Sequence, residues 1–203
     1  MSKRGAILVI SGPSGAGKSS IINKISDKIG AYYFSISTTT RNPREGEQHG
    51  REYFFVTKEE FEKEIENGNF LEYATVHGNY YGTSLVPVKK ALEEGKLVLF
   101  DIDVQGQSIV TSKLADITTS VFLTTPSLDE LKKRLYNRAT DDAQIIEKRL
   151  EQANGELEEI EHFDYLIIND NLDEAAKELL SVVQVARLKS SKEEIADFIN
   201  QWK

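Results

Sequence analysis

Residues Gly12 to Ser19 read GPSGAGKS and directly follow a short apolar run, Ala6–Ser11 (AILVIS). The octapeptide satisfies the pattern G-x-x-x-x-G-K-[ST], whose glycines let successive backbone N–H groups turn inward around phosphate oxygens. The motif requires a buried strand before it and a helix after it, and the sequence predicts both, with the helix over 18–29. A glycine-rich turn without a ligand is the alternative, but the complete motif in its proper context argues against it. We therefore predict a phosphate-binding turn.

Individual residues of this turn have separate expected roles. Lys18 is placed for the β- and γ-phosphates of a nucleotide, and the Ser19 hydroxyl is placed for Mg²⁺. The N-terminus of the following helix adds its partial positive charge. The expected nucleotide-binding set of the turn is Gly12, Pro13, Ser14, Gly15, Ala16, Gly17, Lys18, Ser19 and Ser20. The motif identifies a nucleotide-binding fold but does not by itself identify a reaction.

Short apolar runs alternate with helical segments along the rest of the chain. Buried strands are predicted at 6–11, 97–102, 118–123 and 165–168, and a further short strand at 32–37. Helices are predicted at 18–29, 84–94, 128–138, 145–160, 172–188 and from Ser191 onward. Alternation of this kind favours an α/β fold with a parallel sheet covered by helices on both faces.

One segment, 52–83, breaks this alternation because its strands lie close together in the sequence. Strands are predicted at 53–56 and 70–76, separated by a helix that opens at Thr57, with Glu60 completing a capping box. The preceding stretch, 38–50, is polar and is predicted to be an ordered loop. We expect a small α/β insertion on the main sheet.

Composition limits the domain count and the partners. The 203 residues are 39% hydrophobic and 29% charged, as expected for one globular domain. The net charge of -8 comes from residues 151–203, with 5 basic and 13 acidic side chains, whereas residues 1–150 carry 20 of each. An acidic chain without a basic block is a poor candidate for binding nucleic acid.

Cysteine content and hydropathy limit the chemistry and the location. The chain has no cysteine, which excludes disulfides, thiolate metal sites and a cysteine nucleophile. No apolar run is long enough for a membrane span, and the run at 6–10 is too short for a signal peptide. We expect a cytoplasmic protein with no membrane partner.

Two carboxylates follow the strand predicted at 97–102. Asp101 and Asp103 lie where the carboxyl end of a buried strand meets the ligand-binding edge of a parallel sheet. Either could orient Mg²⁺, directly or through water, or bind a substrate. One of them could instead cap the next helix, and the sequence does not assign the roles.

Arginines gather in two places although the bulk charge of 1–150 is neutral. Arg41 and Arg44 lie in the polar loop and suit bidentate binding of one phosphate group. Arg134 and Arg138 are four residues apart on one predicted helix, and Arg149 follows the break at 139–143. For any one of the three helical arginines, a solvated helix face is an equal alternative. Two arginine clusters beside a phosphate-binding turn favour phosphoryl transfer to an acceptor that itself carries a phosphate.

Taken in order, the motifs of this chain resemble guanylate kinase from near the start to about Asp170. They are the turn at 12–19, then SISTTTRNPREGE at 35–47, G-x-x-YFF at 50–55, FLE at 70–72, GNYYGT at 78–83 and DIDVQG at 101–106. The resemblance implies transfer of the γ-phosphoryl group of ATP to GMP or dGMP with Mg²⁺ in purine nucleotide metabolism. It implies a single domain over 1–203, with a core at 1–37 and 84–203, a GMP-binding insertion at 38–83 and a lid at about 134–149.

Site residues are also implied by the resemblance, position by position. GMP would be bound by Ser37, Arg41, Arg44, Tyr53, Glu72, Tyr81, Gly82, Thr83, Asp101 and Asp103. Asn169 would join the ATP side, and Ser19 would bind Mg²⁺ with Asp101 acting through water. The catalytic set would be Lys18, Arg41, Arg134, Arg138, Arg149 and Asp101. One departure is Ala139, where the family commonly has glycine; alanine restricts the backbone, so lid opening is expected to be altered.

Glu72 has a physical argument of its own once it is singled out. Guanine presents N1–H and N2–H₂ donors side by side, and one carboxylate accepts both, whereas adenine has a bare acceptor at N1. Without the resemblance, however, Glu72 is one of 33 acidic residues.

Two other classes remain as alternatives. The first is a guanylate-kinase-like binding module, as in membrane scaffold proteins that bind phosphopeptides; the intact turn and the absence of appended domains argue against it. The second is another nucleoside-monophosphate kinase, for which the pattern from Arg41 to Thr83 is wrong. The three histidines have no ligand spacing, so no structural metal is expected. We expect a monomer, with a homo-oligomer as the alternative.

Overall fold

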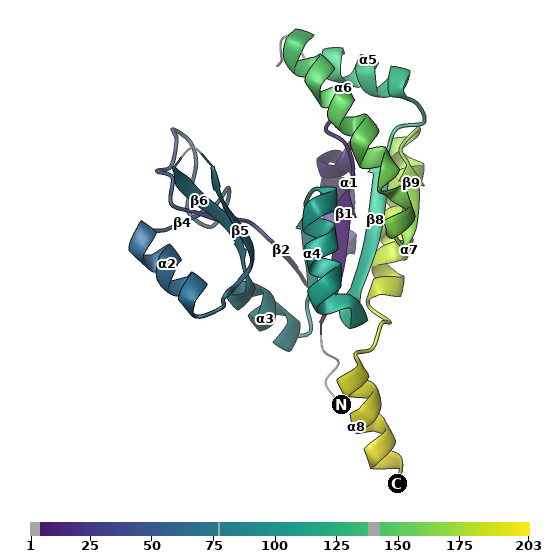
Figure 1. Ribbon diagram of the computed structural model, residues 1–203. Helices are drawn as coiled ribbons and strands as arrows, with labels where there is room; N and C mark the ends of the chain where they lie inside the picture. The colour runs from purple at the N-terminus through teal and green to yellow at the C-terminus, as the bar shows by residue number, and fades with distance from the viewer. Residues whose placement is uncertain (1–4, 77, 138–142) are drawn as a thin grey trace. The chain divides into compact units, whose positions relative to one another are not determined.

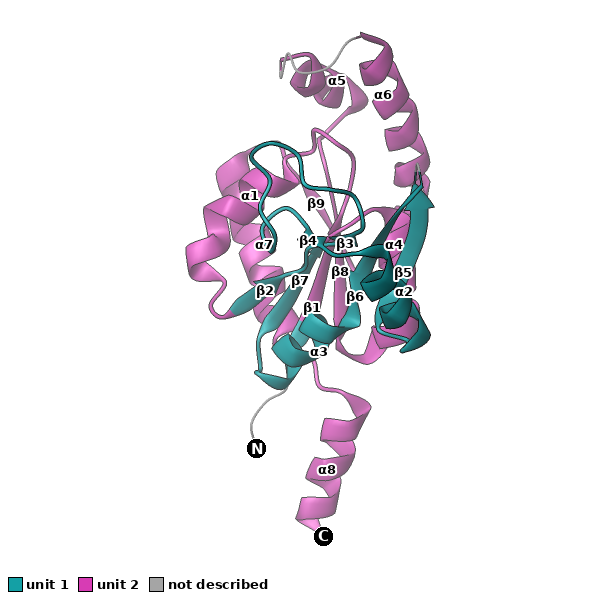
Figure 2. Ribbon diagram, turned by 90° about the vertical axis from the view of Figure 1, so that its left-hand side faces the viewer, with its two compact units in different colours: residues 1–6, 32–100 teal, residues 7–31, 101–203 magenta. Residues whose placement is uncertain are grey.

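The chain divides into two units, coloured separately in Figure 2. The computed structural model describes residues 5–76, 78–137 and 143–203. Unit 1 comprises residues 1–6 and 32–100, and unit 2 comprises residues 7–31 and 101–203. The predicted boundaries of the insertion and of the lid are finer than this division and stay predictions.

Unit 2 is built on a parallel sheet in which β8 (Thr118–Thr124) lies between β1 (Ala6–Ser11) and β9 (Tyr165–Ile168). Every residue of β1 and β8 is buried, as expected for strands covered on both sides. Figure 1 shows α4 (Val104–Leu114) on one face and α1 (Lys18–Ile25) and α7 (Leu172–Ala186) on the other. The predicted α/β class, a mostly parallel sheet flanked by helices, is confirmed.

Two further helices of unit 2 form a pair of their own. α5 (Leu128–Asn137) and α6 (Ala143–Glu158) pack through one apolar cluster. Its members are spaced three to four residues apart on each helix: Leu131, Leu135, Ile146, Leu150 and Ala153. Arg138 and Ala139, both named by the sequence analysis, fall between these helices and lie outside the described residues.

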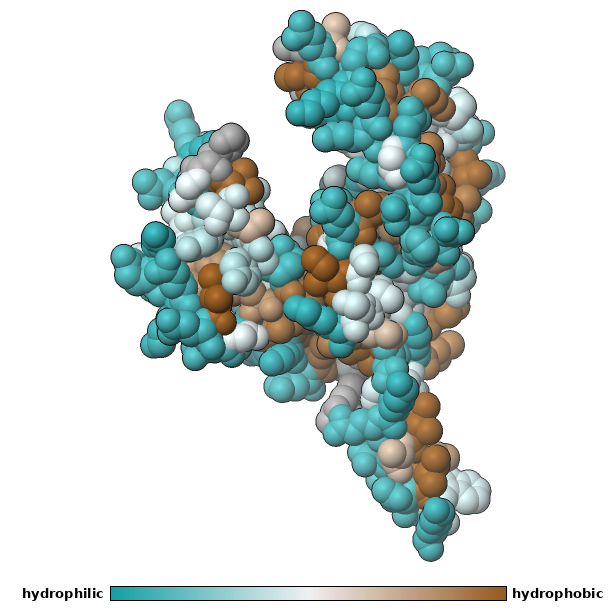
Figure 3. Space-filling view, viewed as in Figure 1, coloured by the Kyte–Doolittle hydropathy of each residue, from teal (hydrophilic) through white to brown (hydrophobic). Residues whose placement is uncertain are grey.

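The C-terminal helix, α8 (Lys192–Trp202), starts at a capping box between Ser191 and Glu194, as predicted. Four large side chains of this helix are exposed: Ile195, Phe198, Ile199 and Trp202. Figure 3 shows brown, hydrophobic surface along the helix. None of the helices among the described residues is long and apolar enough to cross a membrane.

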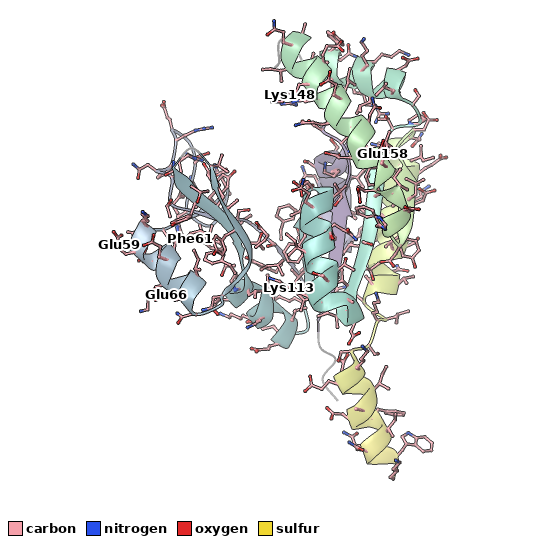
Figure 4. The ribbon with its side chains drawn as sticks, in the orientation of Figure 1. Glu59, Phe61, Glu66, Lys113, Lys148 and Glu158 are labelled. Carbon is pink, nitrogen blue, oxygen red and sulfur yellow. The ribbon has the colours of Figure 1, made fainter. Side chains whose placement is uncertain are left out.

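Unit 1 contains a second, four-stranded sheet. Its strand order is β4 (Phe54–Phe55), β3 (Thr38–Thr39), β6 (Asn79–Ser84) and β5 (Phe70–Val76). Helix α2 (Lys58–Glu66) begins at the predicted Thr57–Glu60 capping box and packs on this sheet through Phe61 (Figure 4). The Phe61 ring is buried and stacks on the rings of Phe70 and Tyr80, with 4.2 Å and 5.0 Å between ring centroids.

The remainder of unit 1 is an α/β piece. β2 (Tyr32–Phe34) and β7 (Leu97–Asp101) pair in parallel, and α3 (Leu85–Glu93) contacts β2. The described part of unit 2 also contains three short 3₁₀ turns, at Ser26–Lys28, Ala115–Ile117 and Ile160–His162.

Several elements differ from the prediction. The stretch 38–50, predicted as a loop, contributes β3 to the second sheet, and neither β6 nor α4 was predicted. The helix predicted over 18–29 ends at Ile25 and continues as a 3₁₀ turn. The strand at 165–168 was predicted to be buried, but only Ile167 is, because β9 pairs on one side and forms the sheet edge.

Candidate active site

The phosphate-binding turn lies between β1 and α1, as the motif requires. Gly12 and Gly17 have φ angles of +137° and +98°, in the region that favours glycine. A Cβ atom on Gly17 would lie 2.3 Å from Nδ2 of Asn169, and one on Gly12 would lie 1.9 Å from the carbonyl oxygen of Leu123. Glycine at both positions is therefore required by sterics as well as by backbone conformation.

Lys18 is held at the mouth of this turn by two oxygens. Its Nζ donates to the carbonyl oxygen of Gly12 at 2.5 Å and lies 3.8 Å from Oδ1 of Asp101. Burial raises the pKa of the Asp101 carboxyl, and the positive charge of Lys18 opposes that rise. The ammonium group therefore lies at the turn with Asp101 beside it, and its expected contact with the β- and γ-phosphates stays a prediction.

Asp103 has a different environment from Asp101. Its Oδ1 accepts from the backbone N–H of Gly106 at 2.8 Å and so caps the N-terminus of α4. Its carbonyl oxygen accepts from the Ser11 hydroxyl at 3.3 Å. Of the two carboxylates that the sequence could not tell apart, Asp103 is the helix cap, and Asp101 faces Lys18.

A cavity of about 360 Å³ opens at the turn. Most of its lining residues were predicted as site residues from the sequence, but Ile102 and, on α6, Glu156 were not. The lining residues are Gly12, Pro13, Ser14, Gly15, Gly17, Lys18, Ser19, Asp101, Ile102, Asp103 and Glu156. The sequence carried one usable signal for Glu156: it lies seven residues after Arg149, on the same face of a helix.

The predicted arginines of unit 2 make specific contacts near the turn. Arg149 Nη1 donates to the Ser14 hydroxyl at 3.0 Å. Arg134 donates through Nε to Glu130 at 2.8 Å and through Nη2 to the carbonyl oxygen of Asn169 at 2.9 Å. Both side chains are therefore directed toward the turn or its neighbours rather than spread over a solvated face. Arg138, the third member of this group, lies outside the described residues.

Asn169 stabilises the turn through a hydrogen bond to its backbone. The side chain is buried, and its Nδ2 donates to the carbonyl oxygen of Ala16 at 2.7 Å. The backbone N–H of Asn169 donates to Thr124 at 2.7 Å, which fixes the residue at the end of the parallel sheet. A second cavity of about 390 Å³ lies here, lined by Gly15, Gly17, Ser20, Arg134, Asn137, Asn169, Asp170 and Leu172.

Replacing Asn169 by alanine is expected to lower the free energy of unfolding by about 1–3 kcal/mol. The reason is that the carbonyl of Ala16 would lose its buried donor. Urea denaturation followed by circular dichroism measures the change. Asn171→Asp, which keeps an oxygen to cap α7, is the control and should be close to neutral. An Asn169→Ala variant as stable as the parent would contradict this stabilising role.

In unit 1 the predicted phosphate-binding residues of the loop gather around Arg41. Its Nη2 donates to Oε1 of Glu47 at 2.9 Å, and its guanidinium lies 5.4 Å from the centre of the Tyr53 ring. The centroid of the Tyr53 ring is in turn 6.0 Å from the centroid of the Tyr81 ring. The hydrogen bond to Glu47 is the main reason that the pKa of Arg41 is raised, and the same bond lowers the pKa of Glu47.

Glu47 also fixes the loop itself. Its Oε2 accepts from the backbone N–H of Arg44 at 2.7 Å, so one carboxylate links both predicted arginine positions. The family motif quoted above contains Glu47, but no separate role was predicted for it. Its contact with Arg41 depends on the loop conformation, which no local pattern specifies.

The residues expected to contact the base lie along β5, β6 and the start of β3. Glu72 pairs with Thr83 across the β5–β6 ladder, and the Thr83 hydroxyl donates to Oε1 of Glu72 at 2.7 Å. Thr38 is opposite Gly82, so Ser37 lies toward the end of β6 that carries Thr83. Sheet register thus brings Ser37, Glu72 and Thr83 into one neighbourhood. Asp101 and Asp103, also assigned to GMP by the resemblance, belong to unit 2.

Within 5–76, 78–137 and 143–203, no three His, Cys, Asp or Glu side chains gather into a group able to hold a metal ion by themselves.

Comparison with known proteins points to one family. The family model described as guanylate kinase matches residues 4–186, a span that ends at the last residue of α7 and leaves out α8. A protein named guanylate kinase from Sulfurimonas denitrificans is 58% identical over 200 residues, which cover 98% of this chain and 97% of that protein. One from Campylobacter jejuni serotype O:2 is 48% identical over 203 residues, covering 100% and 98%. The crystal structure of guanylate kinase from Anaplasma phagocytophilum superimposes with a TM-score of 0.68 at 30% identity, covering 93% of this chain and 89% of that one.

Proposed function

This chain belongs to the guanylate kinase family, whose members phosphorylate GMP, and from that premise we propose the full reaction and the residues that perform it. The reaction is the reversible transfer of the γ-phosphoryl group of Mg²⁺-bound ATP to GMP or dGMP, which yields ADP and GDP or dGDP. The observation that carries the proposal is the cavity at the glycine-rich turn, with Lys18 at its mouth.

The donor nucleotide binds along unit 2. The backbone N–H groups of Gly12–Ser20 and the N-terminus of α1 receive the phosphates of ATP. The second cavity, lined by Arg134 and Asn169, is of a size to receive the adenosine part. Arg134 lines this second cavity, whereas Gly15 and Gly17 line both cavities.

The acceptor binds to unit 1. Arg41 and Arg44 hold the phosphate of GMP, and the hydroxyls of Tyr53 and Tyr81 donate to it. In the described state Arg41 is paired with Glu47. A phosphate dianion offers more acceptors and more charge than this carboxylate, so it competes for the same guanidinium, and Glu47 keeps the group oriented until then.

Guanine is selected by Glu72, Thr83 and Ser37. The free oxygen lone pairs of Glu72 accept from N1–H and N2–H₂ of guanine, and the Ser37 hydroxyl donates to an acceptor of the base. The Thr83 hydroxyl donates to Glu72 and holds the carboxylate in place. AMP in the same place would bring an acceptor against the carboxylate. A site built on such pairing rejects the wrong base strongly, because the mismatched polar groups are left without partners.

Phosphoryl transfer then requires positioning and positive charge rather than a protein nucleophile. Lys18 accompanies the migrating phosphoryl group, and Arg134 and Arg149 neutralise charge that develops on its oxygens. Arg138 belongs to the same proposed set on the basis of the resemblance alone. The insertion at 38–83 and the lid at about 134–149 exclude water from the reacting groups.

The residues at the turn fit a magnesium ion. Mg²⁺ prefers hard oxygen ligands, retains several waters, and is commonly shared with substrate phosphates. Ser19 lines the cavity together with the partly buried Asp101, and a hydroxyl and a carboxylate match that preference. Ser19 would bind the ion directly and Asp101 through water. The ion supplies charge neutralisation on the phosphates of ATP.

A panel of acceptors tests the reaction. With ATP and Mg²⁺, we expect ADP release with GMP and dGMP and at least about 10³-fold lower kcat/KM with AMP, CMP and UMP. Turnover with AMP or UMP but not GMP would overturn the acceptor assignment. GMP binding without turnover of any acceptor would instead support a binding module.

A further inference from the structure

Glu156 is a residue of the phosphate cavity that the family resemblance does not explain. It lies on α6, and its side chain lines the cavity at the turn together with Lys18, Ser19 and Asp101. It also lines a neighbouring cavity of about 760 Å³, so Glu156 and Asp103 stand where the two cavities adjoin. Within the described part of the chain, its Oε2 is buried and has no hydrogen-bond partner.

The placement of Glu156 is fixed by the helix that carries it. Arg149 of the same helix donates to the Ser14 hydroxyl of the turn at 3.0 Å. Seven residues are close to two helical turns, so Arg149 and Glu156 point from the same face of α6. The contact at Arg149 thus anchors α6 against the turn and directs Glu156 to the cavity.

The surroundings of Glu156 destabilise the charged form of its carboxylate when no ligand is bound. Burial raises the pKa of Glu156, the charge of Lys18 lowers it, and the charge of Asp103 raises it again. A third carboxylate beside Asp101 and Asp103 also repels the phosphates that the cavity receives. Without a compensating cation, Glu156 would weaken nucleotide binding.

When a nucleotide is bound, the Glu156 carboxylate can pair only with a group that donates a hydrogen bond. Phosphate oxygens only accept hydrogen bonds, and Lys18 is drawn to the phosphates. Waters held on a divalent cation remain, since Mg²⁺ keeps several of them and each donates hydrogen bonds. The described residues form no cluster able to hold the metal directly, which agrees with an ion carried by the nucleotide and reached through water.

We propose that Glu156 is a positioning residue that accepts a hydrogen bond from water on the nucleotide-bound Mg²⁺ and thereby couples metal binding to nucleotide binding. This inference rests on the proposed use of Mg²⁺ and ATP. The proposed metal site then includes Ser19, Asp101 and the Glu156 carboxylate of α6, the helix that Arg149 anchors to the turn.

The test measures ATP affinity without GMP, so that no turnover intervenes. Isothermal titration calorimetry is run once with EDTA and once with saturating Mg²⁺, for the parent and for Glu156→Gln. The variant should bind metal-free ATP at least as tightly as the parent, because a negative charge has been removed. Its gain in affinity on adding Mg²⁺ should be about 10- to 100-fold smaller, the usual loss when an outer partner of a metal is changed.

A direct metal measurement and a matched variant complete the experiment. Mn²⁺ binding to the protein–ADP complex, followed by electron paramagnetic resonance, should weaken by the same factor in Glu156→Gln. Glu158→Gln changes the same charge at an exposed position two residues away on α6 (Figure 4) and should leave both quantities unchanged.

Each outcome has a distinct meaning. If Mg²⁺ does not tighten ATP binding to the parent, the proposed metal dependence fails and this inference with it. If the parent shows coupling and Glu156→Gln shows the same coupling, only the role of Glu156 is overturned. Equal loss of ATP affinity with and without metal would show that Glu156 merely supports the cavity, which also overturns the proposal.

Discussion

Lys18→Ala should lower kcat by about 10³-fold or more while leaving the affinity for GMP within about twofold of the parent. Among the residues that the structure describes, Lys18 is the one ammonium group that lines the cavity at the turn, where it contacts Gly12 and Asp101. Removing a preorganised positive group from a phosphoryl-transfer site costs several kcal/mol of transition-state stabilisation. The residues assigned to GMP binding in unit 1 are untouched. A coupled ADP-release assay gives kcat, and calorimetry with GMP gives the affinity.

Two variants make this result specific. Lys177→Ala removes an exposed lysine of α7 and should keep the parental rate. Lys18→Arg keeps the charge but replaces a compact ammonium group by a planar fork, and it should restore only part of the rate. Full activity in Lys18→Ala would show that the turn does not serve the transferred phosphoryl group.

The phosphate-binding turn could be predicted from the sequence because its requirements are local. Gly12 and Gly17 are needed for positive φ angles and close approaches, and the flanking strand and helix have strong patterns of their own. The other groups at the turn come from residues that are distant from it in the sequence. Asn169 reaches Ala16 across 153 residues of sequence, and Arg149 reaches Ser14 across 135. No periodicity records such contacts.

The elements missed by the sequence analysis share a weak pattern. β6 reads NYYGTS and α4 reads VQGQSIVTSKL, so each mixes small, polar and apolar residues without a clear period. β6 exists because it pairs with β5 on one side and β3 on the other, and α4 because Asp103 caps it over a buried sheet. Tertiary pairing, rather than propensity, determines both.

Glu72, in the proposed acceptor site, shows the same limit of prediction from sequence. Nothing in its immediate sequence separates it from the acidic residues of α2, and only the family motif singles it out. The β5–β6 register then gives a physical reason, because it places the Thr83 hydroxyl against Oε1 and leaves the other oxygen of the carboxylate for a ligand. Register of this kind is set by the whole ladder, which includes a shift between Phe70 and Glu72.

Glu72→Ala is therefore expected to reduce kcat/KM for GMP by about 10²- to 10⁴-fold. The estimate follows from the loss of two hydrogen bonds to a charged acceptor, at about 1.5–3 kcal/mol each. The kcat/KM for AMP should stay the same or rise, because the repulsion between the carboxylate and the bare N1 of adenine is removed. Steady-state kinetics with both acceptors measure the ratio.

Glu72→Gln separates base recognition from stability, because glutamine has the same shape and can still accept from Thr83. Its amide has only one acceptor oxygen and adds a donor, so it cannot accept from N1–H and N2–H₂ of guanine together. The variant should thus fold like the parent and still lose most of the preference for GMP over AMP. Glu66→Ala, at an exposed position of α2 in the same unit, removes an equal charge and should change neither acceptor (Figure 4). A Glu72→Gln variant with the parental preference would mean that guanine is recognised by the hydroxyls and backbone rather than by this carboxylate.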